Sequence, residues 1–221
     1  MRYTKLALPL LFAMIAAAAL AQQPRPIPVD NEFVRVVVAE NSPGQKSRLH
    51  KHDRNRVMVH LSPGVMQLAF EGGPVKDVKF DAGTVRWDPA DGMHTSENIG
   101  GTRYKIVEVE LKHKGAPVAW PALDPVKVAP SIYRTEFENE QVRVLRVRVR
   151  PGESIPRHQH SVNRVTVALT PARIKLTNVD GSVADASFEA GEARWGTPGT
   201  HSEKSDMTTP FELILIDLKS K

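Results

Sequence analysis

Two short stretches of the chain carry the residues best suited to metal chemistry. Residues 50–56 read HKHDRNR and residues 158–164 read HQHSVNR, so one His-x-His-x-x-Asn-Arg frame occurs twice. Alternate residues of a strand face the same side, so both histidines of a pair can reach one cavity. A third histidine follows about forty residues later in each copy. Three imidazoles suit Zn, Mn, Fe, Ni or Cu and leave positions open. The predicted ligands of a divalent transition metal are His50, His52 and His94 in the first copy and His158, His160 and His201 in the second.

These stretches belong to an internal duplication. Residue n matches residue n + 108 without a gap from residue 31 to residue 87. One position is then lost, and the offset is 107 to the end of both copies. A fixed period of this length indicates a repeated folding unit. The predicted domains are residues 31–114 and 132–221, joined by a linker at 115–131 and preceded by a lead-in at 22–30.

Both copies have the pattern of β-structure. Alternating runs such as RVMVHL at 56–61 and RVTVAL at 164–169 predict strands, and Pro-Gly, Gly-Gly and Asp-Gly pairs mark the turns between them. Neither copy contains an amphipathic helix of normal length. The sequence therefore predicts an all-β protein made of small sandwiches or barrels. Both proline-rich segments are predicted to be extended, and the linker semi-stiff.

The first 21 residues have a different character. A short basic start precedes the apolar run LALPLLFAMIAAAAL, which ends at an A-x-A site before Gln22. This pattern predicts a secretory signal peptide and a periplasmic or secreted mature protein, with an uncleaved membrane anchor as the alternative. Cleavage would lower the formal net charge from +5 to +3 by removing Arg2 and Lys5. Without a basic block or any cysteine, we expect no nucleic-acid partner and no thiol chemistry.

The spacing around the histidines closely resembles the two signature motifs of the cupin superfamily. The first motif runs Gly, five residues, His-x-His, three or four residues, Glu; the second runs Gly, five residues, Pro-x-Gly, two residues, His, three residues, Asn. The matching positions are Gly44, His50, His52, Gly83, Pro89, His94 and Asn98 in the first copy, and Gly152, His158, His160, Gly191, Pro198, Gly199 and His201 in the second. The resemblance implies a bicupin: two tandem antiparallel jelly-roll barrels with those histidines as metal ligands.

The chain departs from this pattern in both copies. The family glutamate, usually the fourth ligand, is replaced by Arg56 in the first copy and Arg164 in the second. The closing asparagine is kept as Asn98 but replaced by Ser205. By these counts the first copy is expected to be the better-preserved site.

An arginine near a divalent ion creates a charge problem. Two positive centres in a poorly hydrated cavity repel each other unless an anion compensates. Because its planar fork binds carboxylates with two hydrogen bonds, Arg56 or Arg164 is predicted to hold a small anionic ligand as a catalytic residue. Two alternatives stay open: Arg56 turns outward to Asp53 or another rim carboxylate, or the arginine replaces the metal altogether.

Other residues of interest are expected to be structural or solvated. Alternation along 56–60 places His60 on the inward face with Arg56, where it is expected to be hydrogen-bonded. Trp87 and Trp195 are expected to pack rather than contact a ligand. Glu108 and Glu110, on a late strand, are expected to be solvated.

The resulting expectation is an exported bicupin that acts on a small carboxylate or enolate. Cupin enzymes include dioxygenases, isomerases and decarboxylases, so the resemblance names a repertoire and no single reaction. The alternatives are a non-catalytic protein that binds a small acid or a metal, and a structural module whose histidines are remnants. Cupin barrels often pair through edge strands, so the resemblance allows a homodimer.

Overall fold

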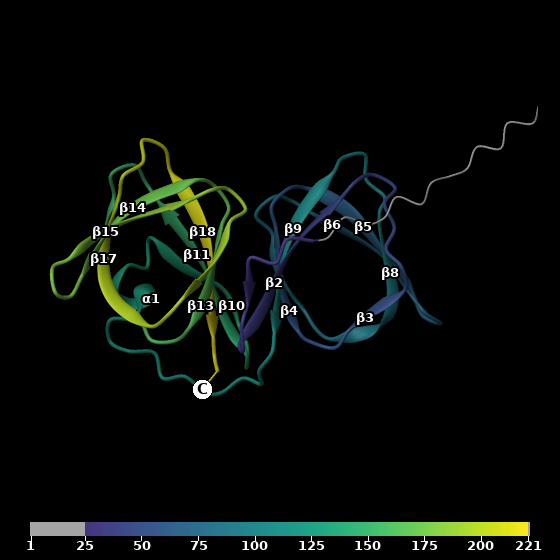
Figure 1. Ribbon diagram of the computed structural model, residues 1–221, viewed down its shortest axis with the longest axis horizontal. Helices are drawn as coiled ribbons and strands as arrows, with labels where there is room; N and C mark the ends of the chain where they lie inside the picture. The colour runs from purple at the N-terminus through teal and green to yellow at the C-terminus, as the bar shows by residue number, and fades with distance from the viewer. Residues whose placement is uncertain (1–24, 221) are drawn as a thin grey trace, which may run out of the picture.

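The computed structural model describes residues 25–220. The predicted signal peptide, residues 1–21, lies outside these residues. Within them, none of the helices has the length and apolar character needed to cross a membrane. The chain folds into two β-barrels that lie side by side (Figure 1). The all-β prediction is confirmed, because strands dominate and α1, Pro125–Val128, has four residues.

Barrel 1 is built from two antiparallel sheets. A five-stranded sheet has the order β1-β2-β9-β4-β7, and a four-stranded sheet has the order β3-β8-β5-β6. The strands are β1 (Val29–Asp30), β2 (Val34–Asn41), β3 (His50–His52), β4 (Arg56–His60), β5 (Gly64–Phe70), β6 (Val75–Phe80), β7 (Val85–Asp88), β8 (Asp91–Asn98) and β9 (Tyr104–Leu111).

Barrel 2 repeats this topology strand for strand. Its sheets have the orders β10-β11-β18-β13-β16 and β12-β17-β14-β15. The strands are β10 (Tyr133–Glu138), β11 (Val142–Val149), β12 (Ser154–His160), β13 (Arg164–Ala168), β14 (Ala172–Asn178), β15 (Val183–Phe188), β16 (Ala193–Gly196), β17 (Gly199–Ser205) and β18 (Phe211–Leu218). The prediction of two antiparallel barrels from one duplicated unit is therefore confirmed.

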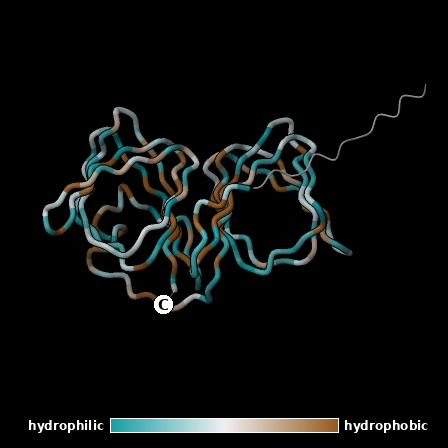
Figure 2. The backbone as a smooth tube through the Cα atoms, in the orientation of Figure 1, coloured by the Kyte–Doolittle hydropathy of each residue, from teal (hydrophilic) through white to brown (hydrophobic). Residues whose placement is uncertain are grey.

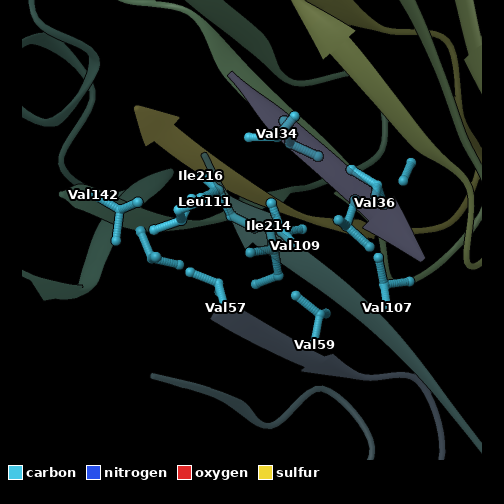
Figure 3. Close-up of a cluster of buried hydrophobic side chains, with 14 of the residues drawn as sticks. Val34, Val36, Val57, Val59, Val107, Val109, Leu111, Val142, Ile214 and Ile216 are labelled. Atoms are coloured by element: carbon cyan, nitrogen blue, oxygen red, sulfur yellow. The ribbon is translucent and has the colours of Figure 1, made fainter. Parts of the chain in front are cut away.

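The two five-stranded sheets pack face to face and share one hydrophobic core (Figure 3). Strand alternation creates this arrangement: Val57 and Val59 of β4 point to the junction, while Arg56 and Met58 line the barrel interior. In Figure 2 the strands along the junction accordingly alternate between hydrophobic and hydrophilic colours. The buried residues of this core are Val34, Val36, Val38, Val57, Val59, Val107, Val109 and Leu111 from barrel 1 and Val142, Val144, Val165, Val167, Ala193, Ile214, Ile216 and Leu218 from barrel 2.

Contacts at the junction are reciprocal, as expected for a duplicated unit that packs on its own copy. Leu169 of barrel 2 packs near Gly83 of barrel 1, and Leu61 of barrel 1 packs near Gly191 of barrel 2. Both glycines have positive φ, 80° and 81°, which favours glycine. A side chain at Gly191 would also bring its Cβ to 2.8 Å from Leu61 Cδ1. The barrels thus pair within one chain as identical subunits pair in a two-fold dimer.

The linker differs from the extended connector predicted for it. It passes beneath the junction to barrel 2, where it forms α1 (Figure 1). The buried Asp124 caps α1 by accepting a hydrogen bond from the Val126 amide, and its carboxylate lies 2.8 Å from Arg143. Ala129 and Ile132 continue into the hydrophobic interior of barrel 2. The prolines of the segment did not predict this docking.

Candidate metal centres

The three predicted ligands of barrel 1 come together on neighbouring strands of the four-stranded sheet. His50 and His52 share β3, and His94 lies opposite His50 on β8. One nitrogen of each ring lies within 4.8 Å of the others, and the Nε2 atoms of His50 and His52 are 3.1 Å apart. Barrel 1 has one residue more than barrel 2 between its tryptophan and its third histidine, in the stretch before His94. A β-bulge in the pairing of β3 with β8, between His50 and His52, accommodates this residue.

Barrel 2 repeats this triad in a more enclosed form. His158 and His160 lie on β12, and His201 lies opposite His158 on β17. The Nε2 atoms of His158 and His160 are again 3.1 Å apart. All three side chains are buried, whereas His50 and His52 of barrel 1 are half-buried.

The backbone fixes the rings so that Nε2 is available for coordination. The Nδ1 atoms of His50, His94 and His158 lie 2.8, 3.0 and 2.9 Å from the carbonyl oxygens two residues earlier. A carbonyl can only accept, so each Nδ1 carries the proton and donates. The lone pair then resides on Nε2, which is the outer contact typical of metal-ligating histidines.

The spacing of the paired histidines suits coordination of one ion. With metal–nitrogen bonds of about 2.0–2.1 Å, ligand atoms at right angles are about 2.8–3.0 Å apart, and tetrahedral ligands are about 3.3–3.4 Å apart. The observed 3.1 Å in both barrels lies between these values. A three-nitrogen face of this kind leaves three positions of an octahedral ion for other ligands.

Electrostatics keep the imidazoles neutral, as coordination requires. Burial, with the nearby charge of Arg56, lowers the pKa of His52 to about 3. Burial also lowers the pKa of His158, and burial with the charge of Arg164 places the pKa of His160 far below its usual value. Near neutral pH these three rings are therefore uncharged.

Arg56 does not take the outward orientation that one of the two alternatives supposed. Its side chain is buried and lines the same cavity as the histidines, so the outward orientation is wrong. Its guanidinium pairs with Asp88 on β7 and lies 3.4 Å from Glu108 on β9, while Asp53 pairs with Lys51. Two carboxylates of the protein thus compensate Arg56, and an external anion is not needed there.

Arg164 has quite different surroundings. It donates a hydrogen bond to the Thr197 carbonyl at 2.7 Å, and Gly196 faces it across the β13–β16 pair where Asp88 faces Arg56. Burial lowers the pKa of the Arg164 guanidinium, and the charges of Asp217 and Glu203 only partly offset this. An anion would therefore be more strongly favoured beside Arg164 than beside Arg56.

Barrel 2 also contains a carboxylate that the sequence analysis missed. Glu203 Oε1 lies 3.2 Å from His201 Nε2, and both residues face inward from β17. Burial raises the pKa of this carboxyl, but His201, His158 and Arg164 outweigh that effect, so the pKa lies below its usual value. The signal in the sequence was the spacing of two residues after His201, which places Glu203 on the histidine's side of a strand.

Tyr133 completes the polar lining of barrel 2. Its hydroxyl lies 3.3 Å from His158 Nε2, and the side chain is 2% exposed. Burial, with the nearby Glu203 carboxylate, raises the pKa of Tyr133 well above its usual value, so it stays a neutral phenol. At offset 108 the matching residue of barrel 1 is Arg25, which lies 3.3 Å from Glu108.

The triad of barrel 1 borders a cavity that is open to solvent. This cavity has about 490 Å³ of empty space, including its mouth. Besides the triad, the charged residues of its lining are Arg25, Arg56, Asp88, Asp91 and Glu108. The net formal charge of these five residues is 2 − 3 = −1, so barrel 1 offers a mixed rather than a cationic pocket.

The expectation that barrel 1 is the better-preserved site is not supported by this geometry. Asn98, the motif residue that only barrel 1 keeps, donates to the carbonyls of Asn41 and Thr102 and so closes loops. It is absent from the lining of the cavity. Tyr133 and Glu203, which lie 3.3 and 3.2 Å from Nε2 atoms of a triad, belong to barrel 2.

Of the other expectations for single residues, some are confirmed and one is wrong. His60 is fully buried, with Nδ1 3.1 Å from the Thr84 carbonyl, as expected. Trp87 and Trp195 pack against the shared core, as expected. Glu108 is buried and paired with Arg56, so the prediction of a solvated side chain is wrong for it.

Comparison with known proteins places the fold. No family model and no curated protein matches the chain. Among solved structures, AerE from Microcystis aeruginosa matches with a TM-score of 0.63 and 14% identity, over 89% of this chain and 99% of that one. A Cupin 2 conserved barrel domain protein from Leptotrichia buccalis matches with a TM-score of 0.55 and 12% identity, over 89% and 88%.

An oxalate decarboxylase with Mn(II) centres, from Bacillus subtilis, matches with a TM-score of 0.56 and 13% identity, over 86% of this chain and 70% of that one. The fold is the cupin fold. At these identities the cupin likeness describes the architecture alone. What the cupin barrels of this chain do must therefore be argued from their own residues.

Proposed function

We propose that this protein is an exported bicupin that holds divalent transition metal in its histidine triads and acts on a small carboxylate or enolate. The observation that carries the proposal is the triad itself. It occurs twice, with ligand nitrogens 3.1 Å apart on the paired histidines and with neutral rings at His52, His158 and His160.

A metal at a triad would supply Lewis acidity to an oxygen of the ligand. The protein's own residues account for orientation and charge. In barrel 2, Arg164 has no counterpart to Asp88, so its guanidinium can hold a carboxylate that also faces the triad. Tyr133 stays a neutral phenol and can donate a hydrogen bond to the same ligand.

The nature of the metal is a separate proposal. The structurally similar oxalate decarboxylase has Mn(II) centres. Three nitrogens on one face leave three open positions on a six-coordinate ion such as Mn, Fe or Ni. We therefore propose a six-coordinate ion as the natural occupant of the triads.

The first experiment measures metal and ligand together. Untagged protein without residues 1–21 is freed of metal by a chelator, and Mn²⁺, Ni²⁺ and Zn²⁺ are titrated separately by calorimetry. Binding that is lost in a double His50→Ala, His158→Ala variant supports the proposal. Less than about a tenth of an equivalent of any metal would overturn it.

A non-catalytic binding protein is the second candidate. It is favoured by the pairing of Arg56 with Asp88 and Glu108 in barrel 1. These ion pairs leave the net charge of that cavity close to zero. Incubating the metal-loaded protein with oxalate and other small oxidisable or decarboxylatable acids, with and without oxygen, separates the two. Binding without turnover of any acid supports the binder, and Arg164-dependent turnover supports the enzyme.

Export rests on the sequence of residues 1–21 and on the cleavage site before Gln22. The test is cell fractionation followed by N-terminal sequencing of the recovered protein. A periplasmic or secreted chain that begins near Gln22 is the expected result. A membrane-bound chain that keeps its first residues would favour the anchor instead.

A further inference from the structure

The surroundings of the two triads differ at the position two residues after the third histidine. Strand β17 continues inward from His201 to Glu203, and strand β8 continues inward from His94 to Ser96 at the matching position. Ser96 lines the cavity of barrel 1 together with the triad, so this position faces the cavity that the histidines border. Barrel 2 therefore has a carboxylate where barrel 1 has a hydroxyl.

The other carboxylates near the barrel interiors pair with arginines, except Asp91 of barrel 1, whose Oδ1 lies 3.4 Å from His94 Nδ1, the nitrogen that donates to the backbone, and not beside a triad Nε2. Asp88 and Glu108 pair with Arg56, and their matching positions in barrel 2 are Gly196 and Leu215. In barrel 2, Asp217 receives two hydrogen bonds from Arg143, at 3.0 and 2.8 Å. Glu203 instead lies with its Oε1 3.2 Å from His201 Nε2, an atom of the ligand set.

We propose that Glu203 is a fourth protein ligand of the metal centre in barrel 2, and that barrel 1 binds its metal through three imidazoles alone. The two centres of one chain then differ in coordination and in affinity. This inference rests on the proposed function, because it presupposes that the triads hold metal.

The distance from Glu203 to His201 supports a ligand role, and coordination would bring the carboxylate closer to His158 and His160, whose cluster with His201 it adjoins. In a six-coordinate ion, adjacent nitrogen and oxygen ligands are about 3.0 Å apart, since both bonds are about 2.0–2.2 Å. The Glu203–His201 separation of 3.2 Å is close to this value. The carboxylate would also offset one of the two positive charges of the ion beside Arg164, as burial of like charges requires.

This carboxylate reaches the site from an unexpected strand. The position of the motif glutamate on β13 is occupied by Arg164, which would leave barrel 2 with three neutral ligands. Glu203 enters from β17 instead, next to the third histidine. Arg164 and Glu203 can therefore both face the metal: Arg164 would hold the anionic ligand, and Glu203 would bind the metal ion.

The experiment isolates each centre before it changes Glu203. A His50→Ala variant retains only the barrel 2 triad, and a His158→Ala variant retains only that of barrel 1. In each background, Glu203→Gln is compared with Glu192→Gln, a matched change at a carboxylate that pairs with the exposed Arg194. Mn²⁺ affinity is measured by competition, and the coordination number by the visible spectrum of the Co²⁺-loaded protein.

The proposal predicts that Glu203→Gln weakens metal binding in barrel 2 only. In the His50→Ala background, Glu203→Gln should weaken Mn²⁺ binding by roughly tenfold to hundredfold and change the Co²⁺ spectrum. The same change in the His158→Ala background, and Glu192→Gln in either, should leave both unchanged. If Mn²⁺ binds but Glu203→Gln changes its affinity less than about threefold and leaves the spectrum intact, Glu203 is no ligand. Failure of any metal to bind would instead overturn the proposed function.

A transplant provides the converse test. Ser96→Glu in the His158→Ala background places a carboxylate at the matching position of barrel 1. It should raise Mn²⁺ affinity about tenfold or more and move the Co²⁺ spectrum toward that of barrel 2, with Ser96→Gln as control. If the Glu and Gln variants bind Mn²⁺ equally well, the position does not face the ion.

Discussion

Replacing each motif arginine by methionine tests the difference between the two barrels. Arg56→Met keeps much of the side-chain volume but leaves Asp88 and Glu108 without their buried cation. Loss of one partner of a buried ion pair costs about 3–5 kcal/mol. Arg25 still lies 3.3 Å from Glu108 and Arg86 still lies 3.1 Å from Asp88, so we expect the lower end of that range.

Arg164→Met should cost less. It removes one hydrogen bond from a charged group to the Thr197 carbonyl, which contributes about 1.5–3 kcal/mol at most, and it also relieves the burial of an incompletely paired guanidinium. We therefore expect Arg56→Met to lower the free energy of unfolding by about 1 kcal/mol more than Arg164→Met does.

The assay is urea denaturation of the metal-free protein at pH 7, followed by tryptophan fluorescence and circular dichroism. A triple variant, Arg56→Met with Asp88→Asn and Glu108→Gln, controls for the loss of packing. It should recover part of the lost stability, because no carboxylate is left uncompensated. Equal costs for the two arginines, or no recovery in the triple variant, would refute the account of Arg56.

Two further predictions concern the interior and the junction. Burial lowers the pKa of His60 in the folded state from 6.5 to about 4, so the unfolded chain binds the proton first as the pH falls. Between pH 6.5 and pH 4, His60 should therefore lower the free energy of unfolding of the wild type by up to about 3 kcal/mol. His60→Gln should flatten this part of the curve of unfolding free energy against pH, and an identical slope would contradict the burial argument. Ile214→Ala, in the core shared by the barrels, should cost about 2–5 kcal/mol and shift unfolding of both barrels together, whereas the exposed Val183→Ala should change stability by less than about 0.5 kcal/mol. Separate thermal transitions of the two barrels in that variant would show that the shared core does not couple them.

Sequence could predict the triads because strand geometry is local. Residues two positions apart on a strand face the same side, so His50 and His52 were expected to lie together. The duplication extended this prediction to His158 and His160. The turn-rich spacing before His94 and His201 then indicated neighbouring strands. These inferences need no knowledge of register.

The environment of each arginine could not be predicted in this way. Asp88 and Glu108 reach Arg56 from β7 and β9, the strands on either side of β4, and only the register of those pairs shows which residues meet. The role of Glu108 was misjudged for this reason, since strand alternation alone does not say which face is enclosed. Glu203 was overlooked because the motif places its glutamate on another strand.

The docking of the linker was also beyond the reach of the sequence pattern. Four prolines predict a stiff segment, but the fold of residues 124–129 depends on the Arg143 side chain, which lies on β11. Asp124 takes part in both the cap of α1 and this ion pair. A contact between two distant segments of this kind carries no local signature.

The central claim is that the histidine triads hold metal, and a crystal grown with Mn²⁺ tests it most directly. Anomalous scattering should show a strong peak in each barrel, about 2.0–2.3 Å from one nitrogen of each of three histidines. The peak of barrel 2 should also lie within bonding distance of Glu203. Peaks absent from both triads at saturating Mn²⁺, or present only at surface carboxylates, would contradict the account.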